Sequence, residues 1–180
     1  MKTICKITIS AVVLVLAAAC GNKTTANAQN TDTTAAKQVT EVIEDGKTYD
    51  GAKFSLVYPK ELNETWASDE IFNASIQDDE YCFLDATYND FGPTTSELKT
   101  YAENWTYMKK MDNCKVDAPS INGKVLTIRS VSEEDKRTEL HFVVLKEDRI
   151  CISGSLTFDS DKEAKYLPIA QSVIKSIKFK

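Results

Sequence analysis

The sequence has few of the residues from which most catalytic and metal-binding sites are built. Its 180 residues contain one histidine, six glycines and four prolines. A single histidine cannot form a His-rich zinc site, and the G-x-S-x-G, H-E-x-x-H and P-loop patterns are missing. No two cysteines have C-x-x-C spacing, which argues against a zinc ribbon or a thioredoxin-type motif. The sequence therefore indicates no cofactor and no metal.

Long apolar runs are also missing, except near the N-terminus. Residues 7–19 are almost wholly apolar, but a transmembrane helix needs about 20 such residues. The run follows a basic start with Lys2 and Lys6 and ends in three alanines, which is the order of a secretory signal peptide. We therefore expect a signal peptide over residues 1–19.

The stretch LAAAC, which ends at Cys20, resembles the lipobox of bacterial lipoproteins. In that family the cysteine carries a diacylglycerol and becomes the first residue of the mature chain. The resemblance implies that Cys20 is lipidated and that acyl chains such as palmitate anchor the protein to a membrane of the cell envelope. Two or more acyl chains give stable attachment. The alternative is a secreted protein with a chance cysteine.

Residues 20–48 are expected to form a flexible tether. The segment from 21 to 38 is rich in Thr, Ala, Asn and Gln and contains no aromatic residue. Such a composition cannot bury enough apolar surface to offset the entropy lost on ordering. The tether would hold the remaining domain, residues 49–180, outside the cytoplasm.

The charge balance is acidic. The whole chain has 22 basic and 27 acidic residues, and loss of Lys2 and Lys6 with the signal peptide leaves 20 against 27, a net charge of −7. A nucleic-acid-binding protein is expected to have a basic face, and docking on anionic lipid also needs basic residues. The composition thus argues against nucleic acid as a partner and leaves the acyl chains as the membrane contact.

Apolar periodicity predicts one α+β domain with a twisted antiparallel sheet and helices packed on it. Period-two alternation indicates strands in KFSLVYP, IFNASIQ, YCFLDATY and INGKVLTIRSVS. Helical spacing predicts an amphipathic helix over Ser96–Met111, with Thr94 and Glu97 as a capping box. Residues 159–179 are expected to form a second helix, with Pro168 close to its start.

A hairpin is expected around Glu147 and Asp148, between TELHFVVLK and RICISGSLTF. The apolar faces of the two segments constrain its register. A two-residue loop at this position would pair Val144 with Cys151, which lies on the wrong face. We therefore expect a loop of three residues.

Four segments within residues 49–180 carry a further resemblance: KFSLVYP, the helix after GPTTSEL, the hairpin ELHFVVLKEDRICISGSL and the closing SVIKSIKF. In these apolar patterns the domain is similar to the PsbP-like fold, which includes the extrinsic photosystem II protein and envelope lipoproteins of the DcrB type. The resemblance implies a non-enzymatic accessory or binding module. It transfers no functional residue, because no functional motif is matched.

His141 and three cysteines are the remaining candidates for chemistry. His141 shares a face with Glu139 and Val143, so it is either a general base or metal ligand or, as we expect, a histidine on the sheet surface. Cys82 fits a small buried hydrophobe. Cys114 and Cys151 have only one basic residue each within two positions, which is little support for a reactive thiol. The sequence leaves open whether any of the three forms a disulfide.

Two other groups of residues could form sites. Acidic clusters occur at residues 78–80, 133–135 and 159–163, but none has the glycine and distal glutamate of a calcium loop, so we expect turns and helix caps there. Tyr101, Trp105 and Tyr107 lie on one predicted helix and form either a ligand platform or, as we expect, part of the core.

Three hypotheses about function follow. The first and favoured one is a lipid-anchored module that binds an envelope protein or a small ligand and performs no chemistry. The second is an envelope enzyme with scattered site residues around His141 or a thiol, which predicts His141 or Cys151 in a pocket beside a carboxylate. The third is a spacer without pocket or partner.

Overall fold

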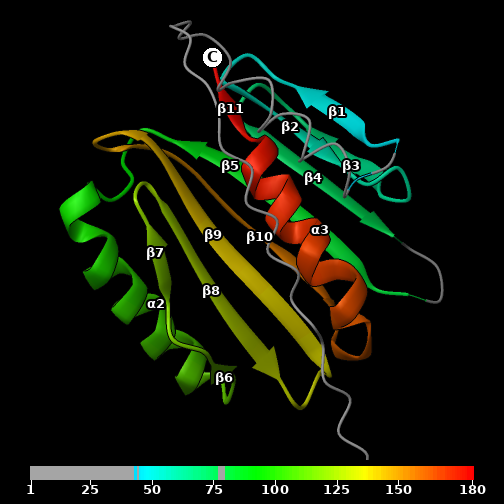
Figure 1. Ribbon diagram of the computed structural model, residues 1–180, viewed down its shortest axis with the longest axis vertical. Coiled ribbons are helices and arrows are strands. Elements are labelled where there is room, and N and C mark those ends of the chain that lie inside the picture. Colours follow the sequence, from blue (N-terminus) through cyan, green and yellow to red (C-terminus); the bar gives the residue numbers. More distant parts are fainter. Residues whose placement is uncertain (1–42, 44, 77–79) are drawn as a thin grey trace, which may run out of the picture. The chain divides into compact units, whose positions relative to one another are not determined.

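The computed structural model describes residues 43, 45–76 and 80–180 (Figure 1). Within them the strands are antiparallel and form two sheets, and two α-helices accompany them. The α+β class expected from the sequence is confirmed. Cys20 and the residues expected to form the signal peptide lie outside the described part. In that part, no helix combines the length and the apolar character needed to cross a membrane.

The larger sheet has eight strands: β3 (Asn63–Ala67), β4 (Ile71–Ile76), β5 (Cys82–Asn89), β6 (Lys115–Val116), β7 (Ser120–Asn122), β8 (Val125–Ser132), β9 (Arg137–Glu147) and β10 (Ile150–Asp159). Their order is β3-β4-β5-β10-β9-β8-β6, and β7 also pairs with β8. The long strands β9 and β10 therefore lie at the centre, and β5 pairs with β4 on one side and with β10, not β6, on the other.

The smaller sheet contains β1 (Lys47–Asp50), β2 (Phe54–Tyr58) and β11 (Lys178–Phe179), in the order β1-β2-β11. The helices are α2 (Leu98–Met111) and α3 (Glu163–Ser176), and each follows a short 3-10 turn, Thr95–Glu97 and Ser160–Lys162. Figure 1 shows α3 in front of the larger sheet, running in roughly the same direction as its long strands. Among the described residues, Ile43 already belongs to the core ahead of Tyr49, because it is buried with the residues of the smaller sheet.

The larger sheet has a different core on each face, because successive side chains of a strand point to opposite sides. On β9, Leu140 and Phe142 belong to the core formed with α3 and the smaller sheet. Val143 and Leu145 belong to a second core formed with α2. The two helices thus cover opposite faces.

The predicted helix over Ser96–Met111 is confirmed as the 3-10 turn and α2. Its capping box is present: the Thr94 backbone N–H donates to Glu97 Oε2 at 2.9 Å. A capping box satisfies two of the backbone groups that a helix start leaves unpaired. This end of α2 is consequently well fixed.

The second helix differs from the prediction at both ends. It begins at Glu163, so Pro168 is its sixth residue and not close to its start. Proline inside a helix costs about 3 kcal/mol, but Tyr166, Ala170 and Val173 of α3 are buried in the core and offset that cost. The prediction was also wrong beyond Ser176, where the chain leaves the helix and forms β11.

The β9–β10 hairpin has the predicted faces but not the predicted loop. Glu147 pairs with Ile150 across a two-residue turn, and the register then shifts so that Ile152 pairs with Val144. A β-bulge places two residues opposite one and so changes the phase of the pairing. The bulge thus brings the apolar faces of the two strands into register, which we had expected a third loop residue to do. The second turn residue, Arg149, has a φ of 70°.

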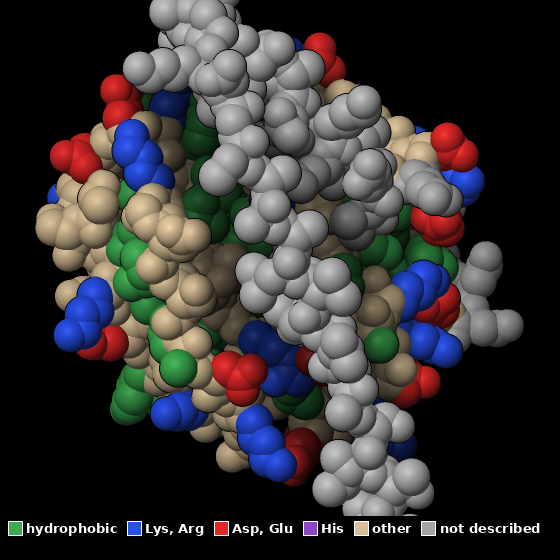
Figure 2. Space-filling model, viewed as in Figure 1, with side chains coloured by type: hydrophobic (Ala, Val, Ile, Leu, Met, Phe, Trp, Pro, Cys, Tyr) green, Lys and Arg blue, Asp and Glu red, His purple; other side chains and the backbone are tan. Residues whose placement is uncertain are grey.

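Charged side chains of both signs are interspersed over the described residues on the face shown in Figure 2. No large area of a single sign is visible there among the described side chains. This agrees with the absence of a basic footprint in the composition.

Candidate functional site

The face of the larger sheet beneath α2 is covered over only part of its width. Leu98, Ala102 and Trp105 of α2 pack on apolar side chains of β8 and β9, namely Leu126, Ile128, Val143 and Leu145. Further across the same face, β4 and β5 carry the polar side chains Asn73, Ser75, Asp85 and Thr87, which are half-buried, together with Ile71 and Phe83. The described elements therefore leave an open area of mixed polar and apolar side chains beside the helix.

A pocket of about 560 Å³ lies where α2 begins. It is bounded by the Phe91–Pro93 loop, the first turns of α2 and the β9–β10 turn. Its lining combines aromatic and apolar groups with neutral polar ones and one pair of opposite charges: Asn89, Phe91, Gly92, Pro93, Glu97, Thr100, Tyr101, Asn104, Val143, Arg149, Cys151 and Ser153. Such a lining is typical of a binding site.

The loop at the rim of the pocket is held close to β10. The Gly92 N–H donates to the Arg149 carbonyl at 2.9 Å, and Arg149 donates to the Gly92 carbonyl at 3.3 Å and to Glu97 Oε1 at 3.1 Å. A Cβ at position 92 would lie 2.4 Å from Cys151 Sγ, so any other residue would have to displace the loop or the Cys151 side chain. The neighbouring side chain, Phe91, is 91% exposed. A fixed loop thus presents a bare aromatic ring beside the pocket.

Cys151 forms part of the pocket wall but is not activated. It is 1% exposed, and burial raises its pKa to about 11. A reactive thiol needs a lowered pKa, usually from a nearby cation, whereas the Arg149 side chain binds Gly92 and Glu97. Cys82 is buried in the core as predicted, and Cys82, Cys114 and Cys151 are all free thiols.

His141 lies under α2 and not on an open surface, which corrects the sequence prediction. The predicted face is right, but α2 covers it and leaves the side chain 8% exposed. Its ring stacks on Trp105, with centroids 4.8 Å apart, and Nε2 is 3.2 Å from the Tyr101 hydroxyl. Burial, reinforced by Lys109, lowers its pKa to about 4. His141 is therefore neutral near pH 7 and belongs to the packing beneath α2.

Trp105 also joins this core, as predicted, whereas Tyr107 is exposed and Tyr101 is half-buried and lines the pocket. Among residues 43, 45–76 and 80–180, no three His, Cys, Asp or Glu side chains are arranged to hold a metal ion.

Asp85 is a residue of interest that the sequence analysis missed. It sits on β5 opposite Ser155 of β10, and Ser155 is in turn opposite His141 of β9. The three do not form a catalytic relay, because the Ser155 hydroxyl donates to Asp85 at 2.6 Å while His141 Nε2 faces Tyr101. The signal in the sequence was an acidic residue in the middle of the predicted strand YCFLDATY. A strand residue that merely faces water does not have to be a carboxylate.

A second pocket, of about 270 Å³, lies near the end of α2 and contains paired charges. Lys109 Nζ is 2.5 Å from Glu139 Oε2, and the Arg137 guanidinium lies 3.7 Å from the centre of the Tyr81 ring. Lys109 and Glu139 thus neutralise each other. Asp112, Asp135 and Arg137 of the same pocket form no ion pair among the described residues, and the Arg137 Nε has no hydrogen-bond partner there.

The acidic clusters take the structural roles that were expected of them, where they are described. Glu80 pairs with Lys165, and Asp159 accepts a hydrogen bond from the Tyr81 N–H at 2.8 Å. Asp135 accepts a bond from the Ser132 hydroxyl at 2.9 Å in a turn. Asp78 and Asp79 lie outside the described residues.

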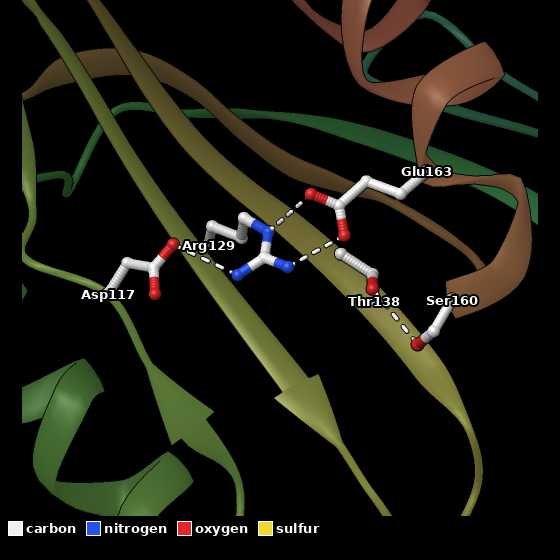
Figure 3. A network of polar contacts seen from close by, with 5 residues as sticks. All are labelled: Asp117, Arg129, Thr138, Ser160 and Glu163. Carbon is white, nitrogen blue, oxygen red and sulfur yellow. Dashed lines mark hydrogen bonds and ion pairs between the residues drawn. The ribbon is translucent and has the colours of Figure 1, made fainter. Parts of the chain in front are cut away.

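The polar network in Figure 3 is also structural. Arg129 of β8 binds Glu163 at the start of α3 through two contacts of 3.0 and 2.6 Å, and it binds Asp117 at 3.0 Å. The Thr138 and Ser160 hydroxyls are 3.0 Å apart in the same region. A guanidinium bound by two contacts to one carboxylate is a strong, oriented contact, and here it fixes α3 on the sheet.

No family model matches the chain, and no curated protein matches its sequence. Among solved structures, it is similar to a protein from Bacteroides thetaiotaomicron, with 19% identity, 75% of this chain and 48% of that chain covered, and a TM-score of 0.47. The chain thus spans about half the length of that protein. It is also similar to the PsbP (CyanoP) of Synechocystis sp. PCC 6803, with 14% identity, coverages of 75% and 92%, and a TM-score of 0.48.

The third similar structure is the Ran-binding protein Mog1p of Saccharomyces cerevisiae. The identity is 9%, the alignment covers 74% of this chain and 95% of that chain, and the TM-score is 0.51. A PsbP, the family that the sequence resembles, is thus among the similar structures. At such identities the similarity concerns the fold alone, and by it this chain shares the fold of Mog1p.

Proposed function

We propose that this chain is a non-catalytic binding module that lipid on Cys20 holds at a membrane of the bacterial cell envelope. Its binding site is the pocket beside the start of α2. The observation that carries this proposal is Phe91, an aromatic side chain 91% exposed at the rim of a preformed pocket. Aromatic anchors of this kind contribute much of the energy in protein interfaces.

The chemistry of the pocket supports binding over catalysis. His141 and Cys151, the two residues expected for an enzyme, are both held in neutral forms by burial. Cys151 lines the pocket without an activating cation. The His141 ring stacks on Trp105, and its Nε2 lies within hydrogen-bond distance of the Tyr101 hydroxyl. Mog1p, which has the same fold, is a Ran-binding protein, so this fold serves protein binding in at least one other case.

The envelope location rests on the N-terminal sequence. The LAAAC stretch, the short apolar run before it and the polar segment after it have the order of a lipoprotein leader and tether. A tether of this kind would let the domain reach a partner in the same membrane or near it.

Photocrosslinking from two positions tests the proposal. A photoreactive phenylalanine analogue replaces Phe91 in one variant and Tyr107 in the other, and crosslinked peptides from cells are identified by mass spectrometry. Tyr107 is a matched control, because it is also an exposed aromatic residue but does not line the pocket. We expect a reproducible adduct from position 91 alone, which Cys20→Ala diminishes. Equal adducts from both positions, or none from position 91, would contradict the proposed site.

A further inference from the structure

Asp85 is a partly buried carboxylate without a cation beside it. Its side chain lies on the open face of the larger sheet, between Asn73 of β4 and Ser155 of β10. The Ser155 hydroxyl donates to it at 2.6 Å. No ion pair within the described part of the chain includes Asp85. Within the described residues, its negative charge is thus supported by hydrogen bonding from Ser155 and by no cation.

The surroundings of Asp85 disfavour that charge. Desolvation raises its pKa, the hydrogen bond from Ser155 opposes this, and the nearby Glu139 carboxylate raises the pKa further. Glu139 itself is neutralised by Lys109. Buried acids in proteins are almost always paired. An unpaired one that faces an open area therefore favours a ligand that brings a positive charge.

Asp85 lies close to the pocket of the proposed function. On β10, Ser153 lines that pocket and Ser155 contacts Asp85; on β5, Thr87 pairs with Ser153 and Asp85 pairs with Ser155. The two rows are two residues apart on the same face, which corresponds to about 7 Å along the strands. One bound segment can therefore occupy the pocket and reach Asp85.

We propose that the pocket and Asp85 together bind an extended segment of a partner protein in which an apolar side chain and a Lys or Arg side chain are two residues apart. The apolar side chain lies in the pocket beside Tyr101 and Ser153, and the cationic group binds Asp85. In an extended segment, side chains two residues apart point the same way and are about 7 Å apart, which matches the step from the row of Ser153 to the row of Asp85.

The charges near the pocket fit a cationic partner. Arg149 and Glu97, the charged residues of the pocket lining, form an ion pair at 3.1 Å and neutralise each other. Asp85 then remains as the charged side chain that selects a cationic group over a neutral one. The chain as a whole has 27 acidic and 22 basic residues, so its net field attracts a basic partner. This inference rests on the proposed function, because it gives the chemistry of a partner for the same pocket.

Two peptides test the inference by NMR titration of the purified full-length protein. The first is acetyl-Phe-Ser-Arg-amide; the second has citrulline, an uncharged isostere, in place of arginine. We expect the arginine peptide to bind the wild-type protein about tenfold more tightly, because hydrogen bonds to charged groups are the stronger ones. In Asp85→Asn the two peptides should bind equally. Ser75→Ala, on the same open face, is the matched control and should retain the preference.

The outcomes separate this inference from the proposed function. Equal binding of the two peptides to wild type, or an arginine preference that persists in Asp85→Asn, overturns the cation site at Asp85. Neither result contradicts the pocket as a binding site. Binding of neither peptide, together with no crosslink from position 91, overturns both. If 4-phenylbutylamine binds as tightly as the arginine peptide, the occupant is a small amine and not a polypeptide. Asn can accept the Ser155 hydrogen bond, and thermal unfolding shows that the variant is folded.

Discussion

Three titratable side chains on the face beneath and beside α2 are shifted toward their neutral forms, and burial is the first cause in each. His141 and Cys151 lie under the helix or in the pocket wall, and Asp85 lies on the adjoining open area. A histidine and a thiol that stay neutral have ordinary roles in packing. A carboxylate differs from them, because its neutral form is rare at pH 7 and its negative charge needs a cation or hydrogen-bond donors as partners.

At the residue scale, Asp85→Asn is expected to leave the protein at least as stable as wild type at pH 7. The pKa of Asp85 is higher in the folded than in the unfolded chain. The folded state therefore binds more protons, and wild type loses stability as the pH rises from the unfolded pKa through the folded one. Urea unfolding at pH 3 and pH 7 measures this. A variant clearly less stable than wild type at pH 7 would show that the carboxylate holds the sheet together.

His141 gives the opposite dependence on pH. Its pKa falls from 6.5 to about 4 on folding, so the unfolded chain binds more protons between these values and stability falls as the pH falls. At about 1.4 kcal/mol per unit, the loss between pH 7 and pH 4 is on the order of 3 kcal/mol.

The His141→Gln variant cannot bind that proton. We expect its free energy of unfolding, measured in urea, to change less than that of wild type over the same pH range. The same pH dependence in both proteins would show that another group causes it.

At the scale of helices and strands, the periodicity of apolar residues predicted those elements that bury one face. α2, β2, β4, β5 and the faces of the β9–β10 hairpin follow from alternating or helical apolar positions, because each element buries one side. β3 was not predicted, since all five of its residues are exposed and no alternation marks it. The bulge after the hairpin turn depends on turn geometry, which the apolar pattern does not encode.

The Phe91–Pro93 loop gives a prediction for an element. Gly92→Ala places a Cβ against Cys151 Sγ, and forcing extra atoms into a packed site costs about 1–3 kcal/mol. We expect this loss of stability together with weaker crosslinking from position 91. Cys151→Ala removes the sulfur, so Gly92→Ala should cost less in that background. A double-mutant cycle in urea that gives additive effects would refute the close contact of loop and strand.

At the scale of the whole molecule, the sequence did not predict the pocket. Its walls come from the Phe91–Pro93 loop, from α2 and from the β9–β10 turn. Arg149 and Glu97 bind each other although 52 positions separate them. Single-sequence patterns describe neighbours along the chain, so contacts of this range appear only once the order of strands is known. Asp85 was missed for the same reason, since its setting depends on β4 and β10.

The anchor gives a prediction for the intact protein. We expect cells fed an alkyne-tagged palmitate to label the wild-type protein and not Cys20→Ala, and we expect the variant to leave the membrane fraction. Two or more acyl chains hold a protein stably, and a chain without them has no such attachment. Labelling of the variant would place the lipid elsewhere, and equal membrane retention would indicate a different means of attachment.

The position of β10 between β5 and β9 delays closure of the larger sheet during synthesis of the chain. β5 ends at Asn89 and β10 begins at Ile150, so about 60 residues are made between them, which takes roughly 3–12 s at ordinary synthesis rates. Throughout that interval one edge of β5 has no partner, and pairing between distant segments is slow in any case. A nascent chain with this topology therefore exposes an unpaired strand edge for seconds before its larger sheet can close.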